Sequence, residues 1–226
     1  MPKYVDADLR RQDVVEAVFR IIASDGLERA SLREVAEEAG LAVGSVRHYF
    51  SSSEELLIHS FGVVVDRITG RLNEAAQAVA GCTPGTSEHR AAVLTLLGQI
   101  LPLDEERAVD SCVWLAFKNA ARIRPFLAPE ADRSHRAVAA AMGELVMELI
   151  APPSDIDGGT TGGTNGQDSG DAADRQVLVT EAERLLAMLE GLSMHALLQP
   201  EWMTAQMCHE VLESHLDTLT PPVKGH

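Results

Sequence analysis

Apolar residues recur every three or four positions along most of this chain, and no stretch alternates convincingly between apolar and polar residues. The first spacing places an apolar stripe on one side of a helix, whereas strict alternation would indicate a half-buried strand. Aromatic residues make up only 4% of the 226 residues, so Ala, Leu and Val must supply the core. A core of this composition favours helices over a β-sandwich. We therefore expect an all-α protein.

The charge and the cysteine content exclude several classes of protein. The formal net charge of −15 excludes a uniformly basic coat for nucleic acid, although it leaves room for a local basic face. Cys82, Cys112 and Cys208 are odd in number and far apart, which argues against a disulfide framework. The longest apolar stretch, residues 93–103, is too short to span a bilayer, and the polar residues 4–12 do not resemble a signal peptide. We expect a cytoplasmic protein.

Short helices with sharp ends are expected in the first sixty residues. An apolar stripe over residues 14–22 predicts a helix that Gly26 ends. Residues 31–34 (Ser-Leu-Arg-Glu) have the form of a capping box, in which the serine hydroxyl and the glutamate carboxylate each bind a free backbone N–H. They open a predicted helix over residues 32–39, and a three-residue link leads to another over residues 43–50.

The last two helices have the lengths and the link of a helix-turn-helix. At about 100° per residue, Val43, Val46 and Phe50 are expected to point inward. The outward residues are Gly44, Ser45, His48 and Tyr49, with Arg47 on the flank. A merely solvated helix would normally carry Glu and Lys there. Glycine permits close approach to a DNA groove, and the other side chains can bond base edges or phosphate oxygens.

A second capping box at residues 52–55 opens a predicted helix that runs to about residue 80. Its N-terminus offers N–H groups and a positive dipole end, which predicts a phosphate site beside the outward face. Further helices are expected over residues 87–101, 104–124 and 129–150, with prolines at or near their ends.

The composition changes completely over residues 152–171, where a glycine-rich run predicts a flexible loop. Helices with heptad seams are expected after it, over residues 174–198 and 201–219. Two seams per subunit would form a four-helix interface in a two-fold dimer. The predicted interface residues are Leu178, Leu185, Leu189, Leu192, Ala205, Leu212 and Leu219.

Residues 31–41 (SLREVAEEAGL) and 46–57 (VRHYFSSSEELL) resemble the DNA-binding domain of the TetR family of transcriptional regulators. The resemblance covers roughly residues 10–57 and implies an N-terminal three-helix DNA-binding domain, placed at residues 1–53. It also implies a larger C-terminal helical domain for ligand binding and dimerisation, placed at residues 54–226. Residues 101–107, 113–117 and 189–193 resemble the ligand domain of the choline/betaine-regulator-like subgroup. This would suggest repression relieved by a small effector, without making choline that effector.

Two residues depart from the family pattern. Ala42 stands where the family usually has a Ser or Thr cap, a loss of on the order of 1 kcal/mol, so we expect the recognition helix to order fully only on DNA. Ser53 stands where a Lys is usual, which removes one ionic phosphate contact, and our hypothesis is that Arg47 restores it. Arg33 either touches phosphate or pairs along its own helix. The predicted DNA-binding residues are Arg33, Ala42, Val43, Gly44, Ser45, Arg47, His48, Tyr49 and Ser53.

The middle helices carry a candidate effector site. Phe61, Trp114, Phe117 and Met142 would line an apolar pocket to which Asn119 adds polarity, and the alternative is a plain core. No cofactor, no metal site and no catalytic arrangement is expected, so the chain is not predicted to be an enzyme.

The expected function is that of a homodimeric repressor, which binds a palindromic DNA operator and is released by an unknown small-molecule effector. One alternative is an activator, or a regulator without a ligand, of the same fold. Another is a helical small-molecule-binding protein or enzyme whose helix-turn-helix is only structural, and a third is a pure protein-interaction module built on the heptad seams.

Overall fold

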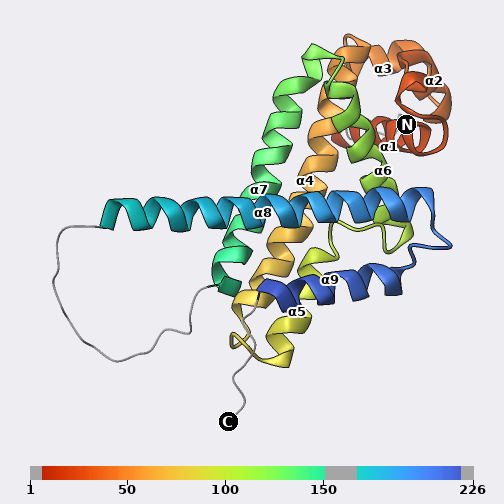
Figure 1. The fold of residues 1–226 in the computed structure, drawn as a ribbon. Helices are drawn as coiled ribbons and strands as arrows, with labels where there is room; N and C mark the ends of the chain where they lie inside the picture. Colours follow the sequence, from red (N-terminus) through yellow and green to blue (C-terminus); the bar gives the residue numbers. More distant parts are fainter. Residues whose placement is uncertain (1–6, 151–166, 220–226) are drawn as a thin grey trace. The chain divides into compact units, whose positions relative to one another are not determined.

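The computed structural model describes residues 7–150 and 167–219, and every regular element within them is helical (Figure 1). The all-α prediction is therefore confirmed. The elements, with η for a 3-10 helix, are α1 (Ala7–Asp25), η1 (Leu27–Arg29), α2 (Leu32–Glu38), α3 (Val43–Tyr49), α4 (Ser53–Ala80), α5 (Ser87–Leu97), α6 (Glu105–Ala121), η2 (Pro125–Leu127), α7 (Ala128–Ile150), α8 (Gln167–Leu198) and α9 (Ala205–Leu219). Among these described helices, none combines the length and the apolar character needed to cross a membrane.

The chain divides into two compact units. The first contains the residues up to 71 together with residues 99–135, so it holds α1, α2, α3, most of α4 and α6. The second contains residues 72–98 and those from 136 onward, with α5, most of α7, α8 and α9. The DNA-binding domain predicted over residues 1–53 lies within the first unit, and α4 and α7 each contribute to both units.

The core of the first unit forms around α1, which contacts α2 and α6. The apolar stripe predicted over residues 14–22 is the buried face of this helix, with Val14 and Val18 fully buried. The helix ends at Asp25, directly before Gly26, as expected. Burial of a whole helical face against two partners provides most of the stability of such a short helical domain.

Two of the predicted helices are shorter in the structure. The helix predicted over residues 87–101 ends at Leu97. The one predicted over residues 104–124 begins at Glu105 and ends at Ala121. Asp104 is its N-cap, since the Asp104 carboxylate accepts a 2.8 Å hydrogen bond from the backbone N–H of Arg107.

The boundaries near the C-terminus also need correction. Most of the loop predicted over residues 152–171 lies outside the described residues, but α8 begins at Gln167, so the last part of that range is helical. Polar composition did not distinguish the first turns of this helix from a loop. The last helix begins at Ala205, because the Thr204 hydroxyl accepts a 3.2 Å hydrogen bond from the Met207 N–H and caps it.

The heptad seams of α8 and α9 are buried within the chain itself, in the second unit. This corrects the prediction of a dimer interface for five of its residues, Leu185, Leu189, Leu192, Leu212 and Leu219, all less than 9% exposed. A heptad spacing shows that a helix buries a seam, but not whether the partner helix belongs to the same chain. Leu178 is half-buried and Ala205 is exposed, so their assignment to an interface stays a prediction.

Candidate nucleic-acid interface

The first helix of the helix-turn-helix, α2, is capped by Ser31, whose hydroxyl accepts a 3.3 Å hydrogen bond from the Glu34 N–H. Only this half of the predicted capping box forms. The Glu34 carboxylate does not return to the Ser31 backbone but pairs with Arg29 at 2.8 Å. The ion pair competes for the carboxylate, so the sequence pattern predicted the cap but not its reciprocal bond.

The turn between α2 and α3 depends on Gly40, which has a φ of 65°. The Gly40 N–H donates to the carbonyl of Glu37 at 3.1 Å, and the Leu41 N–H donates to the carbonyl of Ala36 at 2.8 Å. This pair of bonds is a Schellman motif, which needs the left-handed conformation that glycine adopts without strain. The turn therefore fixes the direction in which α3 leaves α2.

One side of α3 is held by the core and the other is open. Val46 and Phe50 are fully buried, as predicted. Val43 is 37% exposed, so the prediction that it points inward is wrong. It is exposed because it lies in the first turn of α3, before the helix enters the core. Four residues are exposed along the same side: Gly44, Ser45, Arg47 and His48. Tyr49 is half-buried, and its ring meets the ring of His48 in a T-shaped arrangement with the centroids 5.4 Å apart.

Two arginines of the motif have no charge partner among the described residues. Arg33 and Arg47 are exposed, and neither forms an ion pair or a hydrogen bond within that part of the chain. Arg33 therefore does not pair with a neighbour on its own helix within the described residues, which was the alternative to a phosphate contact. Two unpaired guanidinium groups on an otherwise acidic chain are available for phosphate oxygens.

The start of α3 lacks a side-chain cap. Ala42 adopts the extended conformation of an N-cap residue, but its side chain offers no hydrogen-bond acceptor. The first free N–H groups of α3 therefore have no local side-chain partner at this position. Because Ala42 is exposed, these N–H groups are open to an acceptor from outside the chain, such as water or a phosphate oxygen.

The start of α4 is more acidic than a phosphate site should be. Ser52 caps the helix, accepting a 3.1 Å bond from the Glu55 N–H, and Ser53 is half-buried in the first turn. The Glu55 carboxylate accepts bonds from both the backbone N–H and the hydroxyl of Ser51, which lower its pKa. Glu54 is also exposed there. These negative charges oppose a phosphate, and the phosphate site expected at this terminus stays a prediction.

The C-terminal end of α3 is fixed by contacts from α1 and α4. The Arg11 guanidinium of α1 lies 4.9 Å from the centre of the Phe50 ring. The His59 ring of α4 lies 5.3 Å from the same ring. Burial, and then the charge of Arg11, lower the pKa of His59, so this imidazole is neutral near pH 7. The cationic Arg11 and the neutral His59 therefore both contact Phe50, and these contacts hold the end of α3 against the rest of the first unit.

Three of the five predicted effector residues, Phe61, Trp114 and Phe117, are buried in the core of the first unit. Phe61 and Phe117 stack in parallel with ring centres 4.8 Å apart, and the indole N–H of Trp114 donates to the Ser134 hydroxyl at 2.7 Å. Asn119 is exposed on the outer side of α6. The prediction that it adds polarity to this cluster is therefore wrong. Met142 is fully buried but belongs to the second unit.

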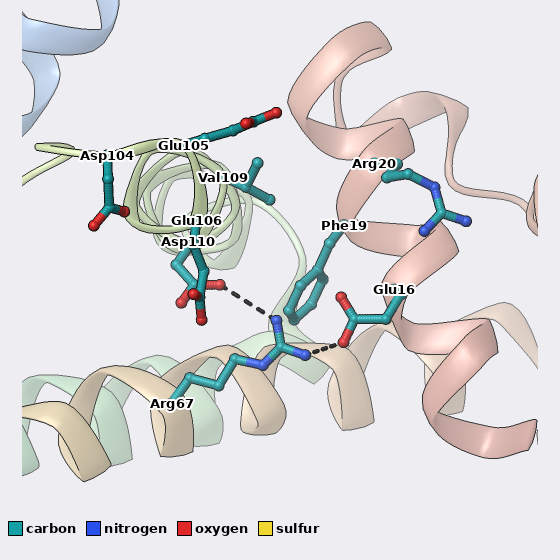
Figure 2. Close-up of a pocket in the computed structure, with 9 residues that line it drawn as sticks. All are labelled: Glu16, Phe19, Arg20, Arg67, Asp104, Glu105, Glu106, Val109 and Asp110. Carbon is teal, nitrogen blue, oxygen red and sulfur yellow. Dashed lines mark hydrogen bonds and ion pairs between the residues drawn. The ribbon is translucent and has the colours of Figure 1, made fainter. Parts of the chain in front are cut away.

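An open pocket of about 500 Å³ lies elsewhere, among α1, α4 and α6 in the first unit (Figure 2). Sequence reasoning missed it because its residues come from three distant segments. They are Glu16, Phe19, Arg20, Arg67, Asp104, Glu105, Glu106, Val109 and Asp110.

A charge network joins the three helices around this pocket. The Arg67 guanidinium of α4 pairs with Glu16 of α1 and lies 3.6 Å from Asp110 of α6, as Figure 2 shows. The same guanidinium lies 4.9 Å from the centre of the Phe19 ring. Burial alone would lower the pKa of Arg67, but its bonds to Glu16 and the charge of Asp110 raise it overall. Arg71 adds a 2.6 Å bond to the same aspartate.

Comparison with known proteins agrees with this geometry. Residues 14–59 match the family model of bacterial regulatory proteins of the tetR family, and residues 164–221 match the C-terminal domain of BetI-type transcriptional repressors. The chain is 32% identical over 219 residues to the HTH-type transcriptional regulator PksA of Bacillus subtilis (strain 168), covering 97% of this chain and 94% of that protein.

Two further comparisons cover the fold and part of the sequence. The chain is 31% identical over 124 residues to the HTH-type transcriptional regulator BetI of Rhizobium meliloti (strain 1021), which covers 54% of this chain and 57% of that one. A crystal structure of a transcriptional regulator from Rhodococcus sp. Rha1 matches with a TM-score of 0.71 and 26% identity. That match covers 92% of this chain and 95% of the other.

Proposed function

Because the chain belongs to the TetR family of bacterial transcriptional regulators, we propose that it acts as a homodimeric repressor that reads a palindromic operator through α3. The chain is a DNA-binding regulator and not an enzyme, in common with the relatives that it matches. Cytoplasmic location is part of the proposal, because the DNA that a bacterial regulator reads lies there.

The observation that carries the proposal is the open side of α3. Arg47 is exposed and forms no ion pair among the described residues, while the preceding residue, Val46, faces the core and is fully buried. The helix is therefore held firmly from behind and presents a cation, small residues and a ring pair in front. A recognition helix needs this combination, because phosphate contacts position it and groove contacts read the bases.

The dimer face is proposed for the side of α8 opposite to its buried seam. Ala187, Gly191, Met194 and Leu198 follow one another at spacings of four, three and four residues, and we call them the α8 stripe. Met194 is 49% exposed and Leu198 is 72% exposed. Trp202, in the turn after α8, is 73% exposed. Small and large apolar residues that lie open on one helix are typical of a surface that a second subunit covers.

Release by an effector completes the proposed mechanism. An effector that binds the helical body would change the spacing of the two recognition helices within the dimer. The coupling works only if the effector binds the conformation that does not fit DNA more tightly than the one that does. Support for repression, rather than activation, comes from the repressor-type C-terminal domain that residues 164–221 match.

The direct test is selection of bound DNA from a random duplex library at about 0.15 M salt, near physiological ionic strength. A dimer should enrich a palindrome with half-sites about one or more helical turns apart. Enrichment of a single half-site would contradict the dimer. No enrichment by a folded dimer would favour the helical binding protein or enzyme in which the helix-turn-helix is only structural.

A further inference from the structure

The side chain of Phe50 anchors the C-terminal end of the recognition helix. Its backbone N–H donates a 2.9 Å hydrogen bond to the carbonyl of Val46, so Phe50 closes the last turn of α3. Its ring is fully buried. The same turn carries Arg47 and His48 on the exposed side. The position of the Phe50 ring therefore decides where these two side chains stand relative to DNA.

Two nitrogen-bearing groups from different helices contact this ring. The Arg11 guanidinium of α1 lies over it at 4.9 Å from the ring centre, and the His59 ring of α4 lies 5.3 Å from the same centre. Arg11 forms no ion pair within the described part of the chain, and its buried Nε atom has no hydrogen-bond partner there. A cation is attracted to the face of an aromatic ring, but a second cation beside the first is repelled by it.

The charged groups around His59 are already engaged with other partners. Arg11 faces it from α1, Glu55 and Asp66 face it from α4, and α3 contributes the uncharged ring of Phe50. The Glu55 carboxylate accepts hydrogen bonds from the N–H and the hydroxyl of the serine four positions earlier. Asp66 pairs with an arginine of α7 at 3.1 Å. Burial and the charge of Arg11 outweigh both carboxylates, so the pKa of His59 is lowered overall.

We propose that Arg11 and His59 are positioning residues for the reading of DNA, because they hold Phe50, and with it the end of α3, in the reading orientation only while His59 is neutral. A proton on His59 places two like charges beside one ring, so the ring is released and the last turn of α3 loses its fixed direction. DNA binding then weakens in mild acid. The inference rests on the proposed reading of DNA by α3 and adds control by pH to it.

His48 should have an effect of the opposite sign. It is exposed on the reading side of α3, where a proton adds a cation that faces the phosphates. A DNA-binding surface with an ordinary exposed histidine therefore binds more tightly as the pH falls. Weaker binding in acid is expected only if a second histidine, behind the helix, must stay neutral.

Fluorescence anisotropy with the selected palindrome, at constant ionic strength, tests this at about pH 7.5 and about pH 5.5, on either side of the ordinary histidine pKa. The wild type should bind about fivefold more weakly at the lower pH, because expelling one proton from each of two subunits costs roughly two- to threefold per subunit. His59→Gln cannot take up the proton, so its affinity should not fall with pH. His48→Gln should weaken in acid at least as much as the wild type. His135→Gln, which replaces an exposed histidine of the same unit, should keep the wild-type pH profile.

A permanent charge at the same position completes the test. His59→Lys should bind weakly at both pH values while its helical circular dichroism spectrum is retained, and if it does not fold, the pH profile of His59→Gln decides alone. The inference is overturned if the wild type binds equally well or more tightly in acid, or if folded His59→Gln weakens as much as the wild type. A wild type that binds no palindrome at the higher pH contradicts the proposed function, and this inference with it.

Discussion

The carboxylate of Asp110 on α6 accepts a 2.6 Å hydrogen bond from Arg71 of α4, although only 1% of that carboxylate side chain is exposed. The same aspartate lies near Arg67, which reaches across to Glu16 of α1. A single buried charge therefore links the DNA-reading part of the first unit to the two helices behind it.

Replacing that charge should destabilise the protein. Asp110→Asn leaves two half-buried arginines without their common counter-charge, and we expect the free energy of unfolding to fall by roughly 2–4 kcal/mol. Urea unfolding measures the loss. Asp217→Asn is the control, because Asp217 pairs with Arg90 while 70% exposed and should change stability by about 0–1 kcal/mol. Equal losses in the two variants would show that the buried network has no special role.

Stability should also fall in mild acid. The pKa of His59 is lowered in the folded chain, so below about pH 6.5 the unfolded chain takes up a proton that the folded chain resists. The contribution of His59 to the free energy of unfolding is complete above that pH and is lost as the pH falls toward the lowered pKa of the folded chain. The urea midpoint of the wild type should decrease more than that of His59→Gln between pH 7.5 and 5.5. His215, whose pKa burial also lowers, adds to the decrease in both proteins. Parallel decreases would exclude the assignment to His59.

Supplying the missing cap of α3 should stabilise the motif. In Ala42→Ser a hydroxyl can accept a hydrogen bond from the free N–H groups of the first turn, which is worth about 1 kcal/mol at an N-cap. Thermal unfolding should report the gain. Ser52→Ala should lose a similar amount, because the Ser52 hydroxyl already caps α4. If Ala42→Ser is no more stable than the wild type, the start of α3 is not limited by its cap.

The α8 stripe should control the association of subunits. Met194→Lys combined with Leu198→Lys places two charges on the proposed dimer face, so sedimentation should show monomers at concentrations where the wild type is a dimer. Ile123→Lys is the matched control, since Ile123 is 64% exposed but belongs to the first unit. A double variant that still sediments as a dimer would place the interface elsewhere.

Local patterns predicted the helices and the motif well, because caps, glycines and apolar spacing act within a few residues. Gly40 ends α2, and Val46 and Phe50 are buried, as their positions indicated. Contacts between distant segments were not predictable in this way. The seam residue Leu185 faces its own chain, and Asn119 faces outward, because which helices become neighbours depends on the whole fold. The pocket at Asp110 was missed for the same reason.

The central claim is that α3 reads DNA, and the affinity of Arg47→Ala for the selected palindrome tests it most directly. Fluorescence anisotropy should show affinity reduced at least about tenfold, with a salt dependence shallower by about 0.9 for each phosphate contact removed. Tyr49→Ala should also bind more weakly, while Arg136→Ala, an exposed arginine of the second unit, should bind like the wild type. Wild-type affinity and salt dependence in Arg47→Ala and Tyr49→Ala would contradict the assigned DNA-binding face.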